Sequence, residues 1–232
     1  MSIPPGALAK ALQELDRSMR KSLDGTKIEN IKNIIGDYAI AAAVASGVAG
    51  VAPGFAGVAA ALTQAGFVWA TYVQINKTLN ISMSENTAKF IGSAIVTNLV
   101  TSAGAFIAIL IGSSILSMVP VLGQAAAIAL NAGLGYTIVY VSAIIYLKLI
   151  THMMQPDGTL HVAESDDTKH IIRDIIKESN LKDMIKEGKA SYKQAKEDGS
   201  IDRAKNAKKC PKCGSEVKDG QRFCSECGSL LQ

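Results

Sequence analysis

The sequence predicts a mainly α-helical protein in which paired apolar helical hairpins precede a small, cysteine-rich module of the β-hairpin type. Two long runs, residues 38–76 and 90–147, contain no charged residue, and only a short polar connection separates them. Each run is interrupted once by proline, at Pro53 and at Pro120. All the cysteines of the chain lie near its C-terminus. We therefore expect two helical hairpins, each turning at a proline, and a separate C-terminal module.

Residues 1–35 are predicted to form amphipathic N-terminal helices. Four apolar residues recur at spacings of four, three and four, as on one face of a helix: Leu8, Leu12, Leu15 and Met19. A turn is expected at Asp24 and Gly25. Thr26 and Glu29 then have capping-box spacing, which predicts the start of a second helix with isoleucines on one face.

Residues 36–150 are predicted to form the apolar helical-hairpin domain. Its arms cover residues 38–51, 55–76, 90–118 and 121–147. Ser82 and Glu85 again have capping-box spacing, so a helix is expected to begin there and lead into the third arm.

The apolar arms predict insertion into a membrane. A spanning helix needs about 20 apolar residues, and the arms of the second run are long enough, whereas residues 38–51 are too few. The first hairpin is therefore expected to be re-entrant. A soluble bundle normally has charged outer faces, and residues 90–147 offer none. The alternative is a soluble α-helical core, because the arms are rich in Ala, Gly, Ser and Thr.

Charge placement predicts the orientation in that membrane. Every charged residue lies in the N-terminal segment, in the connection between the two runs, or after residue 147. Because Lys and Arg favour the cytoplasmic side, we expect an inner (cell) membrane protein with both termini cytoplasmic. The N-terminus does not resemble a secretory signal, since charges interrupt its apolar residues.

Residues 151–207 are predicted to form a charged helical tether. Helices are expected from about Asp167 and from about Leu181. The second carries a lysine row: Lys182, Lys186, Lys189, Lys193 and Lys196. This row fits either a solvated helix face or a helix that lies against an anionic leaflet.

Residues 208–232 are predicted to bind one structural zinc ion. The four cysteines form two Cys-x2-Cys pairs separated by ten residues: Cys210, Cys213, Cys224 and Cys227. Four thiolates fill a tetrahedral site and leave no position for a catalytic water. Residues 208–231 are similar to the zinc-ribbon domain often appended to bacterial membrane proteins. We expect this module to bind a protein, and we expect no nucleic acid, because the net charge is only +4.

Residues 34–149 resemble the YcjF-like helical domain, a domain of unknown function often found with GTPases. The resemblance rests on VAPGFAGVAAALTQAGFVWATYVQINKTLNI, SENTAKFIGS and VPVLGQAAAIALNAGLGYTIVYVSAIIYLK. It implies paired helical hairpins, membrane association and service to a GTPase. The chain itself lacks G-x-x-x-x-G-K-[ST], because Gly188-Lys189 has no earlier glycine at the required spacing. No nucleotide site is carried over.

The sequence does not predict an enzyme. His152, His161 and His170 have no metal-site or catalytic-triad spacing, and carboxylates are sparse in the apolar runs. We predict a non-catalytic, membrane-associated adaptor or scaffold whose zinc ribbon docks a protein, with self-association permitted. The alternative is a soluble or peripheral helical accessory protein of a GTPase or stress-response complex. A third function, a small pore or transporter, would need Asn98, Ser102 and Asn131 to line a cavity.

Overall fold

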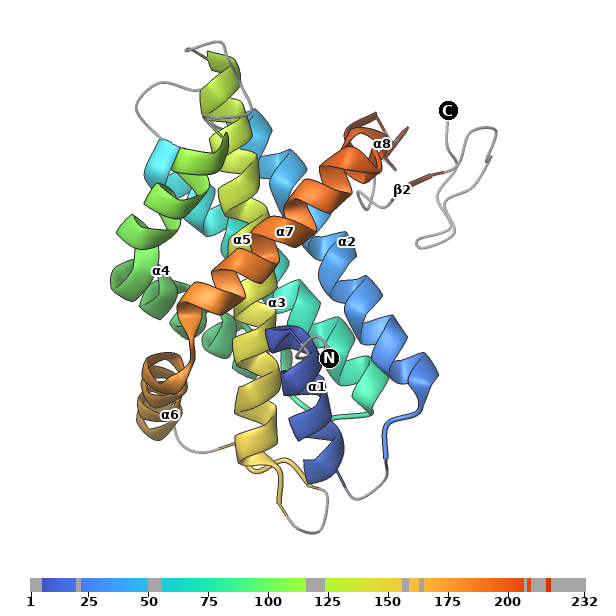
Figure 1. Cartoon of the computed structure of the whole chain (residues 1–232). Coiled ribbons are helices and arrows are strands. Elements are labelled where there is room, and N and C mark those ends of the chain that lie inside the picture. The colour runs from blue at the N-terminus through green and yellow to red at the C-terminus, as the bar shows by residue number, and fades with distance from the viewer. Residues whose placement is uncertain are drawn as a thin grey trace, which may run out of the picture.

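The computed structural model describes residues 6–19, 22–49, 56–115, 124–155, 159–162, 165–206, 208–209 and 216–217. This part of the chain is mainly helical, as the sequence predicts (Figure 1). Its helices are α1 (Ala7–Ser18), α2 (Gly25–Ala49), α3 (Ala56–Leu79), α4 (Glu85–Ile115), α5 (Gln124–Met153), α6 (Ser165–Glu178), α7 (Leu181–Glu197) and α8 (Ser200–Asn206). Two short strands follow: β1 (Lys208–Lys209) and β2 (Glu216–Val217).

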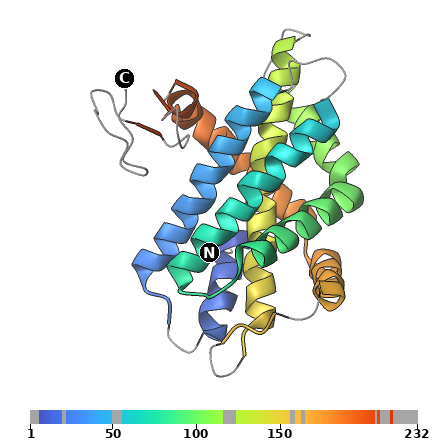
Figure 2. The same ribbon diagram turned by 180° about the vertical axis from the view of Figure 1, so that it is seen from behind.

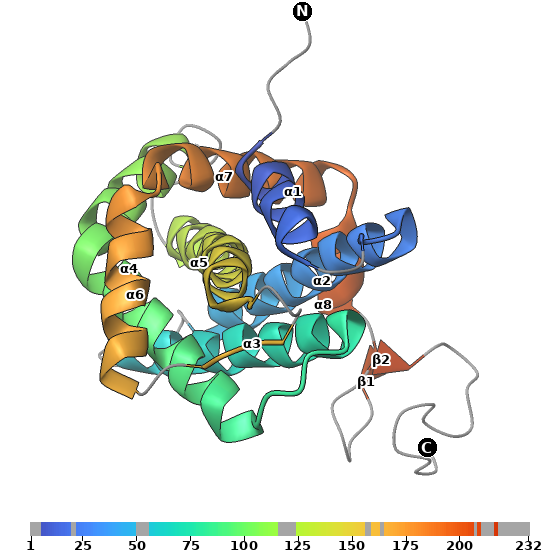
Figure 3. The same cartoon turned by 90° about the horizontal axis from the view of Figure 1, so that it is seen from below.

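Helix α5 forms the centre of the bundle. Seen from below, it is enclosed by α1, α2, α3, α4, α6 and α7, and it contacts each of them (Figure 3). Every residue of α5 from 136 to 147 is buried. Isoleucines of the neighbouring helices belong to the same core: Ile31, Ile35, Ile75, Ile91 and Ile95. A helix that is apolar all round is suited to this central position.

The start of α2 differs from the predicted capping box. The helix begins at Gly25, one residue earlier than Thr26, and the Asp24 carboxylate accepts a hydrogen bond from the backbone N–H of Lys27 at 2.7 Å. Asp24 is therefore the capping residue. Asp and Thr both satisfy a free N–H at a helix start, so capping-box spacing alone does not distinguish them.

The start of α4 is also shifted, and the end of α3 explains the shift. Asn80 has a left-handed backbone (φ 57°), and the N–H of Ile81 donates to the carbonyl of Asn76 at 2.8 Å. This is the Schellman geometry, which ends a helix and uses the chain up to residue 81. Ser84 then caps α4, because its hydroxyl accepts a hydrogen bond from the backbone N–H three residues later. The predicted cap, Ser82, lies two residues before Ser84 and is therefore not the residue that directly precedes the helix.

Helices α2 and α5 cross closely because small residues lie between them. A Cβ atom built on Gly135 would lie 2.8 Å from the carbonyl oxygen of Ala42 and closer still to the hydroxyl of Ser46. One turn further along α2, a Cβ on Gly47 would lie 3.5 Å from the side chain of Ile128. The absence of a side chain at residue 135 is therefore what permits this crossing.

The helix ends that flank the two predicted proline turns lie at the same end of the bundle. The C-terminal ends of α2 and α4 and the N-terminal ends of α3 and α5 lie together at the top of the molecule (Figures 1 and 2). The predicted turns at Pro53 and Pro120 fall outside the described residues. We call the helical residues 40–49, 56–66, 97–115 and 124–135 the uncharged end, since none of them is charged.

The charged segment after residue 151 contributes helices to the same bundle. Helix α6 begins at Ser165, two residues before the expected start, and α7 begins at Leu181 as expected. Helix α7 crosses over α5 (Figure 1). The buried residues of α7 are Met184, Ile185, Gly188, Tyr192 and Ala195. Helix α8, which the sequence did not predict, follows Gly199, a residue with a φ of 75° that ends α7.

Candidate metal centre and the uncharged end

The two short strands flank the first Cys-x2-Cys pair. They are antiparallel, with Lys208 opposite Val217 and Lys209 opposite Glu216. This pairing closes a hairpin around the segment that holds the first two cysteines, as a zinc ribbon requires. The predicted zinc ligands Cys210, Cys213, Cys224 and Cys227 lie outside the described residues, so their roles stay predictions. Four thiolate donors beside a short hairpin fit a structural tetrahedral zinc site.

The described residues contain no second candidate metal site. His, Cys, Asp and Glu side chains within them do not gather in groups of three or more. His152, His161 and His170 are all exposed, the first two around the bridge between Met154 and Leu160 and the third on α6.

One helix of the described part is long and apolar enough to cross a bilayer. It is the Asn131–Met153 portion of α5, and 89% of its most apolar window is buried inside the protein. By length and composition this helix passes the test for a membrane span, but a central helix of a soluble bundle passes it too. Over residues 136–147 the helix contacts protein rather than solvent or lipid. Any lipid contact of this predicted arm is limited to its N-terminal part.

The outer face of α4 loses charge along its length. Its exposed residues recur every four positions and run from charged to uncharged side chains: Glu85, Lys89, Ser93, Thr97 and Thr101. Glu85 and Lys89 form an ion pair at 2.8 Å. Thr101 donates its hydroxyl hydrogen to the carbonyl of Thr97 at 2.8 Å, so this donor is satisfied within the helix.

The outer face of α2 changes in the same direction. Glu29, Asn33 and Asp37 are exposed, whereas Ile40 and Val44, further towards the uncharged end, are half-buried and apolar. Asp37 is therefore the last exposed charge on this helix. Helices α2 and α4, which lie on different sides of α5, thus both lose exposed charge towards their C-terminal ends.

Trp69 of α3 and Lys89 of α4 lie in contact where the exposed charges of α4 end. The Lys89 ammonium lies 4.7 Å from the centre of the Trp69 ring, within range of a cation–π interaction. The two helices approach closely here, since a Cβ on Gly92 would lie 3.3 Å from the Cβ of Trp69. Tryptophan and lysine are both typical of membrane–water interfaces.

Of the polar residues named for a pore, Asn98 uses its amide donor within its own helix. The Asn98 amide donates to the carbonyl of Ala94 at 2.8 Å, in the preceding turn of α4. Asn131 is half-buried on α5. The side chain of Ser102 is outside the described part.

Glu187 forms a polar junction that the sequence does not reveal. Its carboxylate accepts hydrogen bonds from the first N–H groups of α1, at Ala7 and Leu8, and from the hydroxyl of Tyr140 at 3.0 Å. An anion is favourable at a helix N-terminus. Burial and the Glu187 charge hold the pKa of Tyr140 well above its ordinary value, so the hydroxyl stays a donor. Glu187 therefore ties α1, α5 and α7 together.

Comparison with known proteins identifies the C-terminal module alone. Residues 209–231 match the zinc-ribbon domain family, which implies a structural zinc ion. No family match supports the expected YcjF-like domain over residues 34–149. No curated protein matches the chain. No solved structure matches it either.

Proposed function

We propose that this chain is a non-catalytic membrane adaptor. In this proposal the uncharged end inserts into the inner (cell) membrane, and the charged end remains in the cytoplasm with the zinc ribbon. The ribbon then docks a protein partner close to the membrane surface. The resemblance of residues 34–149 to a GTPase-associated domain makes a GTPase one candidate for that partner.

The observation that carries this proposal is the loss of exposed charge along α2 and α4 towards the same end. An exposed helix face in water normally carries charged residues. The outer face of α4 carries them only at its N-terminal end, up to Lys89, and α2 carries them only up to Asp37. Helices without charge are stable in hydrocarbon, where their backbone hydrogen bonds are satisfied internally.

The same geometry defines how deep the insertion is. Helix α5 is buried from residue 136 to residue 147, so on this helix only the N-terminal part is available for lipid. The outer faces of α2 and α4 lose their charge towards that same end of the bundle. We therefore propose a re-entrant insertion of the uncharged end, in place of helices that cross the whole bilayer.

The zinc ribbon supplies the docking function of the proposal. It matches residues 209–231 and follows α8, which contacts α2. A module this small depends on its metal for folding, so the zinc holds a rigid surface at the end of the chain. Four cysteine ligands leave no open coordination position, which favours binding over catalysis.

The second candidate, a soluble or peripheral helical accessory protein, is favoured by the burial of α5. Flotation with neutral lipid vesicles, followed by a carbonate wash, distinguishes the two. For the membrane adaptor, the full chain floats with the vesicles and resists the wash. If the chain instead stays in solution, monodisperse without detergent, the accessory-protein candidate replaces the adaptor.

Two matched pairs of added lysines make the flotation test specific to the uncharged end. Thr97→Lys with Thr101→Lys places two charges on the outer face of α4, where each would have to enter hydrocarbon, at a cost that reaches about 2.5–3.5 kcal/mol at the bilayer centre. We expect this double variant to lose most of its flotation. Asn30→Lys with Asn86→Lys adds the same charge at exposed positions of the charged end and should float like the native chain. Equal flotation of the two variants would contradict the proposed insertion.

A further inference from the structure

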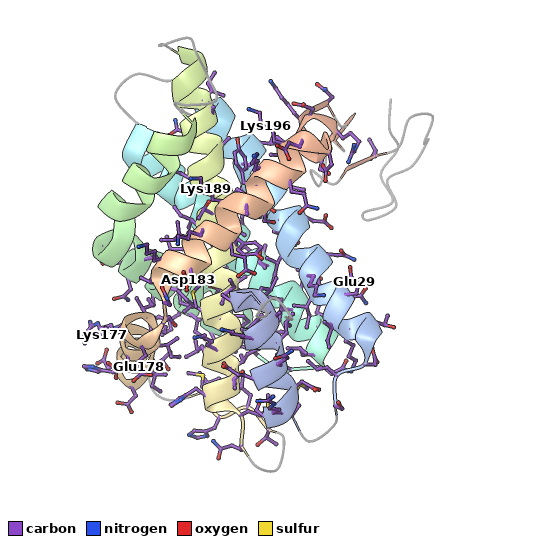
Figure 4. All side chains as sticks on the ribbon, viewed as in Figure 1. Glu29, Lys177, Glu178, Asp183, Lys189 and Lys196 are labelled. Carbon is purple, nitrogen blue, oxygen red and sulfur yellow. The ribbon has the colours of Figure 1, made fainter. Side chains whose placement is uncertain are left out.

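Helix α7 carries a row of lysines on its outer side. Lys182, Lys186, Lys193 and Lys196 are exposed, and Lys189 is half-buried. The row extends along the whole helix, which crosses the front of the bundle (Figure 4). At 1.5 Å per residue, the row measures about 21 Å from Lys182 to Lys196. We call these five residues the lysine row.

Few acidic groups accompany the lysine row. Between Lys186 and Lys196 the one carboxylate is Glu187, which is already bonded to the N-terminus of α1 and to Tyr140. Glu197, at the end of α7, lies 3.6 Å from Lys193. With Asp183 near the start of the helix, α7 carries three carboxylates against five lysines, a net charge of +2 that is concentrated on the side of the lysine row.

The opposite side of α7 is buried against the bundle. A Cβ on Gly188 would lie 3.2 Å from the ring of Tyr140, and the hydroxyls of Tyr136 and Ser191 are 2.7 Å apart. Because the apolar side of α7 contacts α5, it cannot also enter a leaflet in the folded protein. Helix α7 can therefore interact with a membrane only electrostatically, through the ammonium groups of the lysine row.

The C-terminal end of the lysine row lies at the boundary of the uncharged end. Helix α8, which follows α7 directly, contacts α2. Asp198 after α7 and Asp37 of α2 both lie near Tyr136, where their charges add to burial in raising the pKa of its hydroxyl. Asp37 is the last exposed charge of α2 before its apolar part. Lys193 and Lys196 are thus close to the level at which the bundle would enter a bilayer.

We propose that the lysine row binds anionic lipid headgroups of the bilayer into which the uncharged end inserts. This inference rests on the proposed insertion and adds the class of lipid that the protein selects. Anionic headgroups attract each lysine near the surface, and the attraction weakens as salt screens it. Insertion supplies the affinity for lipid in general, and the lysine row supplies the preference for anionic lipid.

Binding of the full chain to two kinds of vesicle tests the inference. One kind contains phosphatidylcholine alone, and the other contains phosphatidylcholine with about a third phosphatidylglycerol. The native chain should bind the anionic vesicles much more tightly, with the difference shrinking as salt is raised. Replacing Lys182, Lys186, Lys193 and Lys196 by Gln should weaken binding to anionic vesicles, by about fivefold for each of the two lysines nearest the surface, Lys193 and Lys196, and by less for Lys182 and Lys186. Binding to neutral vesicles should stay unchanged.

A matched variant controls for the lost charge. Arg17→Gln, Lys32→Gln, Arg173→Gln and Lys177→Gln remove the same number of exposed charges from α1, α2 and α6, and this variant should keep the preference for anionic vesicles. Equal loss in both variants, or no preference in the native chain, would overturn the role of the lysine row while leaving insertion intact. Failure of the native chain to bind neutral vesicles would instead overturn the proposed insertion. If the native chain binds a nucleic acid more tightly than anionic vesicles, and the variant without the four lysines does not, the proposed lipid binding by the lysine row is overturned.

Discussion

The crossing of α2 and α5 depends on Gly135, which leaves room for the backbone of Ala42 and the hydroxyl of Ser46. Gly135→Ala places a methyl group between the two helices, against backbone that cannot rotate away. We expect the free energy of unfolding to fall by about 2 kcal/mol, as in other overpacked sites. Chemical denaturation followed by circular dichroism measures the change.

Gly36 provides the matched control for this substitution. It also lies within a helix, α2, but a Cβ there would have no atom within 4 Å. Gly36→Ala should therefore raise the free energy of unfolding by about 0.5–1 kcal/mol through better helix propensity. If both alanine variants are stabilised, the close crossing at Gly135 is wrong.

The N-terminal caps of α2 and α4 are residues that the sequence pattern does not distinguish from their neighbours. Thr26 and Ser82 have capping-box spacing, yet Asp24 and Ser84 are the caps. The choice at Ser84 follows from the left-handed backbone of Asn80, which ends α3 at the position where a glycine is usual. Glu187 had no local signal at all, because its partners on α1 lie about 180 residues away in the chain.

At the scale of elements, hydrophobic patterning predicted which segments are helical. The arms of the two uncharged runs became α2 to α5, and the stripe at Leu8, Leu12 and Leu15 became the buried face of α1. Patterning could not predict what surrounds α5, because a helix apolar on every side suits both lipid and a protein core. It also missed α8, a short helix with no buried residue.

The zinc ribbon is an element whose folding should be separable from that of the helices. Among the described residues, the buried core extends from Leu8 to Ala195, and the zinc-ribbon match covers residues 209–231. Cys224→Ser removes one predicted thiolate ligand, and we expect the bound zinc to fall well below one ion per chain. The helical circular dichroism and its thermal transition should stay unchanged.

Ser225→Ala is the control for that substitution, since it alters a neighbouring residue without removing a thiolate. Metal content measured by mass spectrometry should remain at one zinc ion per chain. Full zinc retention in the Cys224 variant would show that the ligand assignment is wrong. Unfolding of the helices on zinc loss would show that the ribbon supports the bundle.

At the scale of the whole molecule, most of the charged helical surface and the uncharged helix ends lie at opposite ends of the bundle. Helices α1 and α6 and the start of α2 lie at one end, and the uncharged ends of α2 to α5 lie at the other, where the charged helix α8 contacts α2 (Figure 1). The lysine row of α7 runs from one towards the other (Figure 4).

Quenching of tryptophan fluorescence by brominated lipids tests the insertion most directly. The chain has a single tryptophan, so Trp69→Phe gives a background into which one reporter can be introduced. Phe106→Trp places the reporter on α4 in the uncharged end, and Phe90→Trp places it on the same helix near Lys169 in the charged end. In vesicles of brominated phosphatidylcholine, tryptophan at residue 106 should be strongly quenched and tryptophan at residue 90 should not. Quenching at neither residue, or at residue 90 alone, would contradict the account.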